Sequence, residues 1–417
     1  MTENILQRAE ILVSQGKYED AERLLKDLLI NDPNDVHVLT LLSEVKLQQG
    51  KVEEADRLIN VAIGISPDFG FLFYVKARIS IHLSQYDEAE RNIKQAVEME
   101  PYNANFFALW GSIKLTRKQY DLALELADKS LALDAENLLG LNVRSTALLK
   151  LNDKEESFRT IEGALREDPN NSYTHSNYGW NLLEKGEHKK ALEHFKEALK
   201  NDPNNGYAKA GMAEALKASN FLYKGFLKYS FFMSNLTAKY QWGVIIGFYL
   251  LSKGLRTVAQ QYEALSPYLM PLIILLALFA FSTWVIGPLS NLFLRLNKYG
   301  KYLLDKKEIL SSNFVGVSFL VFLVGIAAYL VLSDMRYLTI AAFGFTMMVP
   351  LSTIFSPTKY KHSLVIFSGV LGLLGIGAIL VTFYTGEIFN TLTTGYFLGF
   401  MGYQWGANFL MIRQSNV

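Results

Sequence analysis

The sequence predicts an all-α fold in which a solenoid of six helix–turn–helix repeats is followed by a helical membrane domain. Two observations carry this prediction. A 34-residue period runs through residues 1–205, and mostly apolar stretches recur after Asn220. Periods of this length are typical of stacked repeats, and about 20 apolar residues suffice to cross a bilayer as a helix.

The period is visible in two series of residues. One series closes each repeat, and its members are Pro33, Pro67, Pro101, Ala135, Pro169 and Pro203. A second series places a small residue at a fixed phase, and its members are Ala21, Ala55, Ala89, Ala123, Ser157 and Ala191. Proline stops a helix, and small side chains let two helices approach closely. We therefore expect two short helices in each of the repeats 1–35, 36–69, 70–103, 104–137, 138–171 and 172–205, and a capping helix over 206–219.

The pattern resembles the tetratricopeptide repeat (TPR) family. The best copy is residues 172–205, with Gly179, Leu182, Ala191, Phe195, Ala198 and Pro203 at the signature positions of the family. Ala135 and Ser157 depart from the pattern, but both are small. The resemblance implies a right-handed solenoid that binds a protein or peptide partner on its concave face and has no catalytic activity of its own.

The resemblance also indicates which residues would line the partner-binding groove. Carried over residue by residue, the lining includes Glu10, Glu44, Phe71, Tyr74, Arg78, Asn142, Tyr173, Ser176, Asn177 and Trp180. The lysines that the family uses to clamp a C-terminal carboxylate are absent. The aromatic residues have two interpretations, because aromatic and arginine side chains serve both as binding anchors and as packing between repeats.

Charge divides the chain into two contrasting parts. Residues 1–217 hold 27 basic and 35 acidic side chains, a formal charge of −8, whereas the remaining 14 basic and five acidic side chains give residues 218–417 a charge of +9. This asymmetry suggests an interaction at a membrane surface. The chain has no cysteine, and its first residues do not resemble a signal peptide, so we expect the repeats in the cytosol.

The apolar stretches after Asn220 predict six membrane spans, at about 238–256, 267–288, 313–332, 337–355, 363–385 and 388–412. Basic residues cluster in 289–311 and 356–362, which the positive-inside rule places in the cytosol. Cytosolic repeats then require the weak segment near 238–256 to cross. The alternative is a re-entrant hairpin at 267–288. The expected location is the inner membrane of a bacterium, with both ends of the membrane domain (241–412) in the cytoplasm.

Two segments are expected to lie at the membrane surface. Residues 220–240 interleave aromatic residues with lysine, a mixture typical of the headgroup region. Residues 289–310 predict one amphipathic helix with Pro288 at its start. Its basic face would contact anionic lipid through Arg295, Lys298, Lys301 and Lys306, or would dock on the acidic repeats.

Small residues mark one face of the last predicted span. They are Gly395, Gly399, Gly402 and Gly406, with the spacing of one helical face. Such a stripe allows membrane helices to pack closely. The sequence leaves open whether this face packs within one chain, joins two copies, or meets another membrane protein.

The functional hypothesis is a membrane-anchored scaffold that recruits or assembles a protein complex. The layout resembles bacterial multi-pass membrane proteins with tetratricopeptide repeats. The alternative is a channel, transporter or lipid-handling domain that the repeats regulate. No catalytic constellation, phosphate-binding loop or metal-ligand spacing is present, so we expect no enzyme, no cofactor and no metal, and no nucleic-acid partner.

Overall fold

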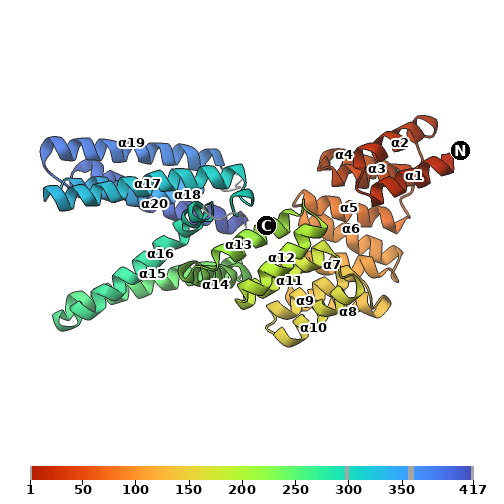
Figure 1. Ribbon diagram of the computed structural model, residues 1–417, viewed down its shortest axis with the longest axis horizontal. Coiled ribbons are helices and arrows are strands. Elements are labelled where there is room, and N and C mark those ends of the chain that lie inside the picture. Colours follow the sequence, from red (N-terminus) through yellow and green to blue (C-terminus); the bar gives the residue numbers. More distant parts are fainter. Residues whose placement is uncertain (1, 296–299, 356–360, 415–417) are drawn as a thin grey trace. The chain divides into compact units, whose positions relative to one another are not determined.

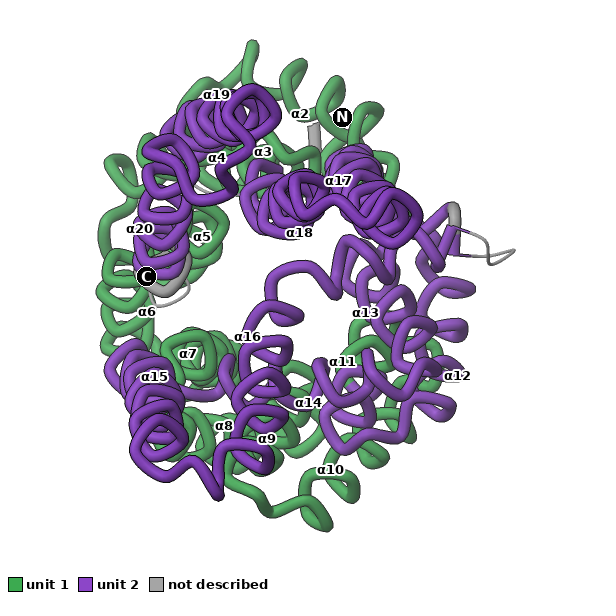
Figure 2. Tube along the Cα trace, turned by 90° about the vertical axis from the view of Figure 1, so that its left-hand side faces the viewer, with its two compact units in different colours: residues 1–177, 417 green, residues 178–416 purple. Residues whose placement is uncertain are grey.

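A computed structural model describes residues 2–295, 300–355 and 361–414. These residues form twenty α-helices, two short 3₁₀ helices and no β-strand. They divide into two compact units, residues 1–177 and 178–416 (Figures 1 and 2). The division lies inside helix α11, whereas the composition of the sequence changes at Asn220.

The repeats alternate A and B helices with constant spacing. The A helices are α1 (Thr2–Ser14), α3 (Val36–Gln48), α5 (Gly70–His82), α7 (Ala104–Thr116), α9 (Leu138–Lys150) and α11 (Ser172–Lys185). The B helices are α2 (Tyr18–Asn31), α4 (Val52–Ile65), α6 (Tyr86–Met99), α8 (Tyr120–Leu133), α10 (Lys154–Glu167) and α12 (His188–Asn201). Helix α8 stops at the same phase as the others although Ala135 replaces proline, so the proline is not required to end the helix.

Small residues allow the helices to pack closely, as the period predicts. Every member of the second series, from Ala21 to Ala191, is fully buried. A Cβ atom on Gly111 would lie 3.0 Å from the Val143 side chain. Ser43 and Ser145 use the same close approach to donate hydrogen bonds to the carbonyl oxygens of Ala55 and Ser157 in the B helices, at 2.8 and 2.9 Å.

The turn between the A and B helices has the same backbone conformation in all six repeats. One residue in each turn has a positive φ angle, and these residues are Gly16, Gly50, Ser84, Lys118, Asn152 and Gly186. They also follow the 34-residue step. Glycine adopts this conformation without steric cost, whereas Ser84 and Lys118 carry a Cβ atom that disfavours it.

The first turn of most A helices, and that of α13, is capped by a side chain one position before the helix. Asp35, Asn103, Asn137, Asn171 and Asn205 each accept a hydrogen bond from a backbone N–H of the following turn. Phe69 occupies the corresponding position before α5 and provides no cap. The Glu100 carboxylate instead accepts a hydrogen bond from the Phe71 N–H at 3.2 Å, and Gly70 leaves the space that this carboxylate needs.

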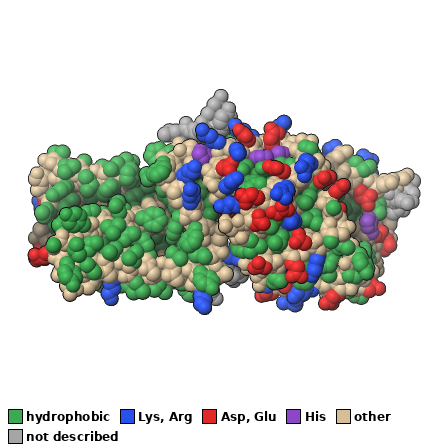
Figure 3. All heavy atoms as spheres, turned by 90° about the horizontal axis from the view of Figure 1, so that it is seen from below, with side chains coloured by type: hydrophobic (Ala, Val, Ile, Leu, Met, Phe, Trp, Pro, Cys, Tyr) green, Lys and Arg blue, Asp and Glu red, His purple; other side chains and the backbone are tan. Residues whose placement is uncertain are grey.

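The C-terminal helices are α13 (Gly206–Lys217), α14 (Phe221–Asn235), α15 (Ala238–Gln261), α16 (Ser266–Leu294), α17 (Lys306–Leu332), α18 (Tyr337–Thr353), α19 (Lys361–Thr385) and α20 (Thr391–Gln414). Within the described residues, three segments are long and apolar enough to cross a membrane: 263–294, 306–332 and 362–385. Helix α18 is apolar but shorter. Hydrophobic side chains cover these helices on the face seen in Figure 3, whereas charged side chains are spread over the repeats.

The expectation of one amphipathic helix over residues 289–310 is wrong for the described residues. Helix α16 continues through Pro288 to Leu294, a 3₁₀ turn occupies Gly300–Tyr302, and α17 begins at Lys306. Asp305 and Glu308 form a reciprocal capping box that fixes this start. A proline inside a membrane helix is tolerated because neighbouring groups satisfy the freed backbone.

Glycines other than the predicted stripe make the closest contacts between apolar helices. A Cβ atom on Gly325 would lie 2.4 Å from the backbone nitrogen of Ala341, and one on Gly344 would lie 2.4 Å from that of Phe322. Helices α17 and α18 therefore touch through their backbones. In the stripe on α20, a Cβ atom would have a described neighbour within 4 Å only on Gly399, at 3.0 Å from Leu371.

The buried face of α20 carries tyrosines rather than the glycines of the stripe. The buried face of this helix carries Tyr396, Phe400, Tyr403 and Ala407, one position beyond each glycine of the stripe. Tyr396 and Thr346 share a hydrogen bond of 2.6 Å between their hydroxyls, and Tyr403 and Thr353 form a second such pair. The glycines at 395, 402 and 406 consequently face away from the described helices of the same unit.

Candidate functional site

Six of the predicted groove residues remain accessible or half-buried on the A helices of the first unit. Arg78 forms an ion pair with Glu44, which occupies the same position one repeat earlier. The Arg78 guanidinium also lies 5.7 Å from the centre of the Tyr74 ring. Glu10 accepts a hydrogen bond from His37 at 3.1 Å. Each acidic group on this surface therefore has a basic partner from the adjacent A helix.

Aromatic rings extend this surface along α5. Phe71 stacks on Tyr74 with ring centres 5.6 Å apart, and Tyr74 stacks on the buried Phe106 at 5.2 Å. Phe69 lies 6.1 Å from Phe71 and is 45% exposed. We call Phe69, Phe71, Tyr74 and Phe106 the aromatic cluster. Sequence reasoning missed Phe69. It is nevertheless visible in the sequence, because the residues at the same position before the neighbouring A helices are Asp35 and Asn103.

Burial raises the pKa of Tyr74, and the negative charge of Glu44 adds to this effect, while Arg78 opposes it. The phenol is therefore neutral at physiological pH. Together with Arg78 it offers a flat, partly apolar surface with hydrogen-bond donors at its edge. Such a combination suits binding of an apolar side chain and nearby carbonyl groups of a peptide.

Three predicted groove residues do not form an accessible surface. Asn142, Ser176 and Asn177 are all at least 94% buried. The Asn177 amide donates hydrogen bonds to the side chains of Asn142 and Thr146 at 3.0 and 3.1 Å, and the Asn142 amide donates to Thr174 at 2.9 Å. These amides hold adjacent A helices together, so they are not available to a partner.

The last two groove residues differ in exposure. Tyr173 is 49% exposed. Trp180 belongs to the second unit, where its indole N–H donates to the Tyr207 carbonyl at 3.2 Å and its ring stacks on Tyr207 with centres 5.5 Å apart. The packing interpretation therefore holds for Trp180.

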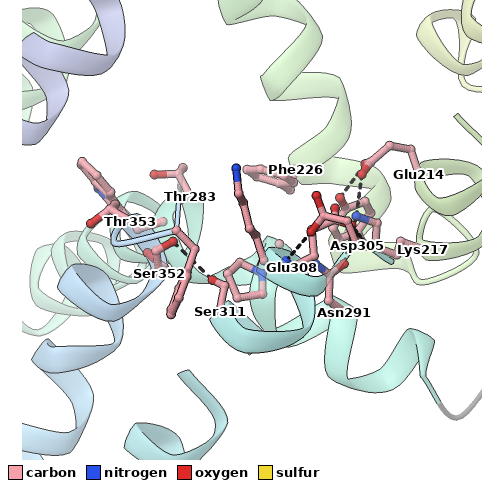
Figure 4. Close-up of a pocket in the computed structure, with 16 residues that line it drawn as sticks. Glu214, Lys217, Phe226, Thr283, Asn291, Asp305, Glu308, Ser311, Ser352 and Thr353 are labelled. Atoms are coloured by element: carbon pink, nitrogen blue, oxygen red, sulfur yellow. Dashed lines mark hydrogen bonds and ion pairs between the residues drawn. The ribbon is translucent and has the colours of Figure 1, made fainter. Parts of the chain in front are cut away.

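The second unit contains a polar cavity of about 520 Å³. Its lining comes from α13, α14, the C-terminal halves of α16 and α18, and the start of α17. Figure 4 shows Glu214, Lys217, Asn291 and Asp305 on one side of it and Thr283, Ser352 and Thr353 on the other. Sequence reasoning did not find this cavity, because its residues lie up to 141 positions apart and share no motif.

A charge pair between the buried Lys217 and the half-buried Glu214 forms one wall of the polar cavity. Lys217 donates to the Glu214 carboxylate and to the Asn291 amide oxygen, the latter at 3.3 Å, and its ammonium lies 5.0 Å from the centre of the Tyr223 ring. The Tyr223 hydroxyl donates to the other Glu214 oxygen at 2.6 Å. Burial and the adjacent negative charge of Glu214 raise the pKa of Tyr223. This phenol is therefore a permanent hydrogen-bond donor.

The four predicted lipid-contacting basic residues do not form one described surface. Arg295 donates to the Asn313 side chain at 2.6 Å. Lys306 is exposed at the first residue of α17. Lys298 lies outside the described residues, as does the side chain of Lys301.

The paired helices and their 34-residue spacing show that the first part of the chain is a tetratricopeptide-repeat solenoid. Family models described as tetratricopeptide repeat match residues 12–79, 72–103 and 172–205, so the chain contains tetratricopeptide repeats. A search of curated proteins finds no match.

Solved structures of repeat proteins show a similar fold. MamA from Desulfovibrio magneticus is 17% identical over 40% of this chain and 95% of that chain, with a TM-score of 0.34. YrrB, described as a TPR protein with an unusual peptide-binding site, is 17% identical over 44% and 95%, with a TM-score of 0.31. Pseudomonas aeruginosa PilF is 16% identical over 51% and 97%, with a TM-score of 0.40. The likeness concerns the fold alone.

Proposed function

We propose that the protein is a membrane-anchored scaffold whose repeats bind a protein segment and thereby recruit or assemble a complex at the membrane. The tetratricopeptide repeats and the apolar C-terminal helices support the two halves of this role. The membrane domain would cross the inner membrane six times, with the repeats and the C-terminus in the cytoplasm. No catalytic role is assigned to either unit.

The observation that carries the binding role is the substitution of a capping residue by an exposed aromatic one. Phe69 stands where the second, fourth, fifth and sixth repeats have Asp or Asn, and Glu100 provides a hydrogen-bond acceptor for α5 from elsewhere. Departures from local rules are expected at functional positions. The partner segment would insert a large apolar side chain beside Phe69 and Phe71 and place backbone carbonyl groups near Arg78.

Replacing Phe69 with Asn should weaken partner binding without lowering the stability of the repeats. Asn suits the extended backbone of position 69 and restores a cap, so the repeats should be unchanged in stability or more stable by about 0.5 kcal/mol. Crosslinking and affinity capture of the full-length chain from native membranes should nevertheless recover several-fold less of the partner. Tyr74→Ala with Arg78→Ala should have the same effect.

Ile30→Asn is a matched control, because Ile30 is a 78% exposed apolar residue on a B helix. This variant should retain capture. If Phe69→Asn captures the partner as well as the unchanged protein does, the aromatic cluster is not the binding surface.

A lipid-handling role for the C-terminal helices is the second candidate function, and it rests on a separate observation, the cavities of the second unit.

A further inference from the structure

A second cavity adjoins the polar cavity. It has a volume of about 480 Å³, and its lining is mainly apolar, with side chains from α14, α15, α16 and α20. Phe226, Thr283 and Trp284 line both cavities. The two spaces therefore meet at these three side chains, one with ionised groups and the other with hydrocarbon and aromatic walls. This arrangement matches a molecule that has a charged head and an apolar tail.

The connectivity places the polar cavity at one end of the apolar helices. The end of α16 is joined to the start of α17 by a short connection, and α18 returns antiparallel to α17, packed through Gly325 and Gly344. The ends of α16 and α18 and the start of α17 therefore lie on the same side of any bilayer that these helices cross. Residues from these ends line the polar cavity. In a bilayer crossed by these helices, the cavity would therefore lie at the depth of the lipid headgroups.

The charges in the polar cavity favour a headgroup that carries both signs. Glu214 is neutralised by Lys217. The carboxylates of Asp305 and Glu308 and the ammonium of Lys307 form no ion pair with any described residue, and all three side chains line the cavity. The carboxylates are hydrogen-bonded only to backbone N–H groups, through the capping box. The net charge of −1 opposes a purely anionic head.

We propose that these joined cavities bind a zwitterionic phospholipid whose headgroup carries a primary ammonium and a phosphate. The ammonium pairs with Asp305 and Glu308, and the phosphate pairs with Lys307. One acyl chain passes Thr283 and Trp284 into the apolar cavity. This site goes beyond the scaffold role, since it requires no residue of the repeat surface, and it gives the membrane domain a ligand of its own.

Native mass spectrometry of the full-length protein in detergent tests this assignment. The probes are a phosphatidylethanolamine and a phosphatidylglycerol with the same acyl chains. The protein should bind the ethanolamine lipid more tightly. Lys307→Ala and Glu308→Gln should each weaken its binding about tenfold, as loss of one charge-assisted contact implies. Thr283→Trp, which fills the junction of the cavities, should do the same.

Lys306→Ala is the matched control, because Lys306 and Lys307 are adjacent and both exposed, but only Lys307 lines the cavity. The charge variants at the start of α17 leave the helix packing intact, so they remain informative if Thr283→Trp misfolds. Equal binding of the two lipids, or equal effects of Lys306→Ala and Lys307→Ala, would overturn the proposal. Binding of free phosphoethanolamine as tightly as the lipid would assign the polar cavity to a soluble ligand instead.

Discussion

Lys114 of α7 donates to the Glu90 carboxylate of α6 at 2.7 Å, and both side chains are 10% exposed. Lys46 and Glu22 form the same pair two repeats earlier, also at 2.7 Å. Each pair joins the A helix of one repeat to the B helix of the repeat before it. Charged groups therefore reinforce the apolar contacts between successive repeats.

The Glu90 pair predicts a loss of stability in acid. Burial alone would raise the pKa of Glu90, but hydrogen bonds from Lys114 and Lys94 outweigh burial and lower this pKa to about 2. The unfolded chain binds a proton at the ordinary pKa of 4.5. The stabilisation is therefore present above about pH 4.5 and is lost as the pH falls towards 2.

Glu90→Gln should lower the free energy of unfolding of the repeats by about 2 kcal/mol at neutral pH, because it leaves Lys114 buried without its charge partner. The deficit should shrink as the pH falls below about 4.5. Urea unfolding of the full-length protein in detergent, followed by circular dichroism, measures it. Glu125→Gln is the control, since the Glu125–Lys129 pair is exposed and worth a few tenths of a kcal/mol. Equal effects at both positions would contradict the buried pair.

The positive-φ turns predict a stabilising substitution. Ser84 has a φ angle of 59°, so Ser84→Gly should raise the stability of the repeats by about 0.5–1 kcal/mol. Asn152→Gly should gain less, because asparagine tolerates this conformation better. Gly50→Ala should lose about 1 kcal/mol. The same urea experiment ranks the three variants, and a destabilised Ser84→Gly would show that the serine side chain has another role.

The glycines of α18 and α20 predict opposite results at two positions. Gly344→Ala should destabilise the C-terminal helices by about 1–3 kcal/mol or more, because its Cβ would overlap the Phe322 backbone. Gly402→Ala should have no effect within one chain, since no described atom lies within 4 Å of such a Cβ. Thermal unfolding in detergent, monitored by size-exclusion chromatography, compares them. Loss of stability only in Gly402→Ala would show that the glycine stripe packs against another helix of the same chain.

The six-span proposal predicts the sidedness of two connections. The chain has no cysteine, so single cysteines at Ser266 and Thr385 report position directly. An impermeant maleimide should label both in intact cells, while a cysteine at Ser84 in the repeats should react only after lysis. If Ser266→Cys is protected until lysis, helix α15 does not cross and the re-entrant alternative gains support.

The sequence predicts the solenoid in detail because its information is periodic. The ends of the B helices, the turns and the buried small residues follow from one 34-residue step. The roles of Asn142 and Asn177 were not predictable in this way, because their amides pair with each other across a repeat boundary. The partner of the glycine stripe was not predictable for a related reason. Spacing shows that a face exists, but the hydroxyl groups on α18 decide that the adjacent tyrosine face turns inward.

The two tyrosine–threonine pairs have a consequence for the alignment of α20. Thr346 and Thr353 are seven residues apart, and so are Tyr396 and Tyr403. Sliding α20 by two helical turns would keep one hydroxyl pair and leave the other tyrosine and threonine unpaired among apolar side chains. The two pairs together therefore fix the position of α20 along its axis relative to α18. Apolar contacts alone would allow several such positions.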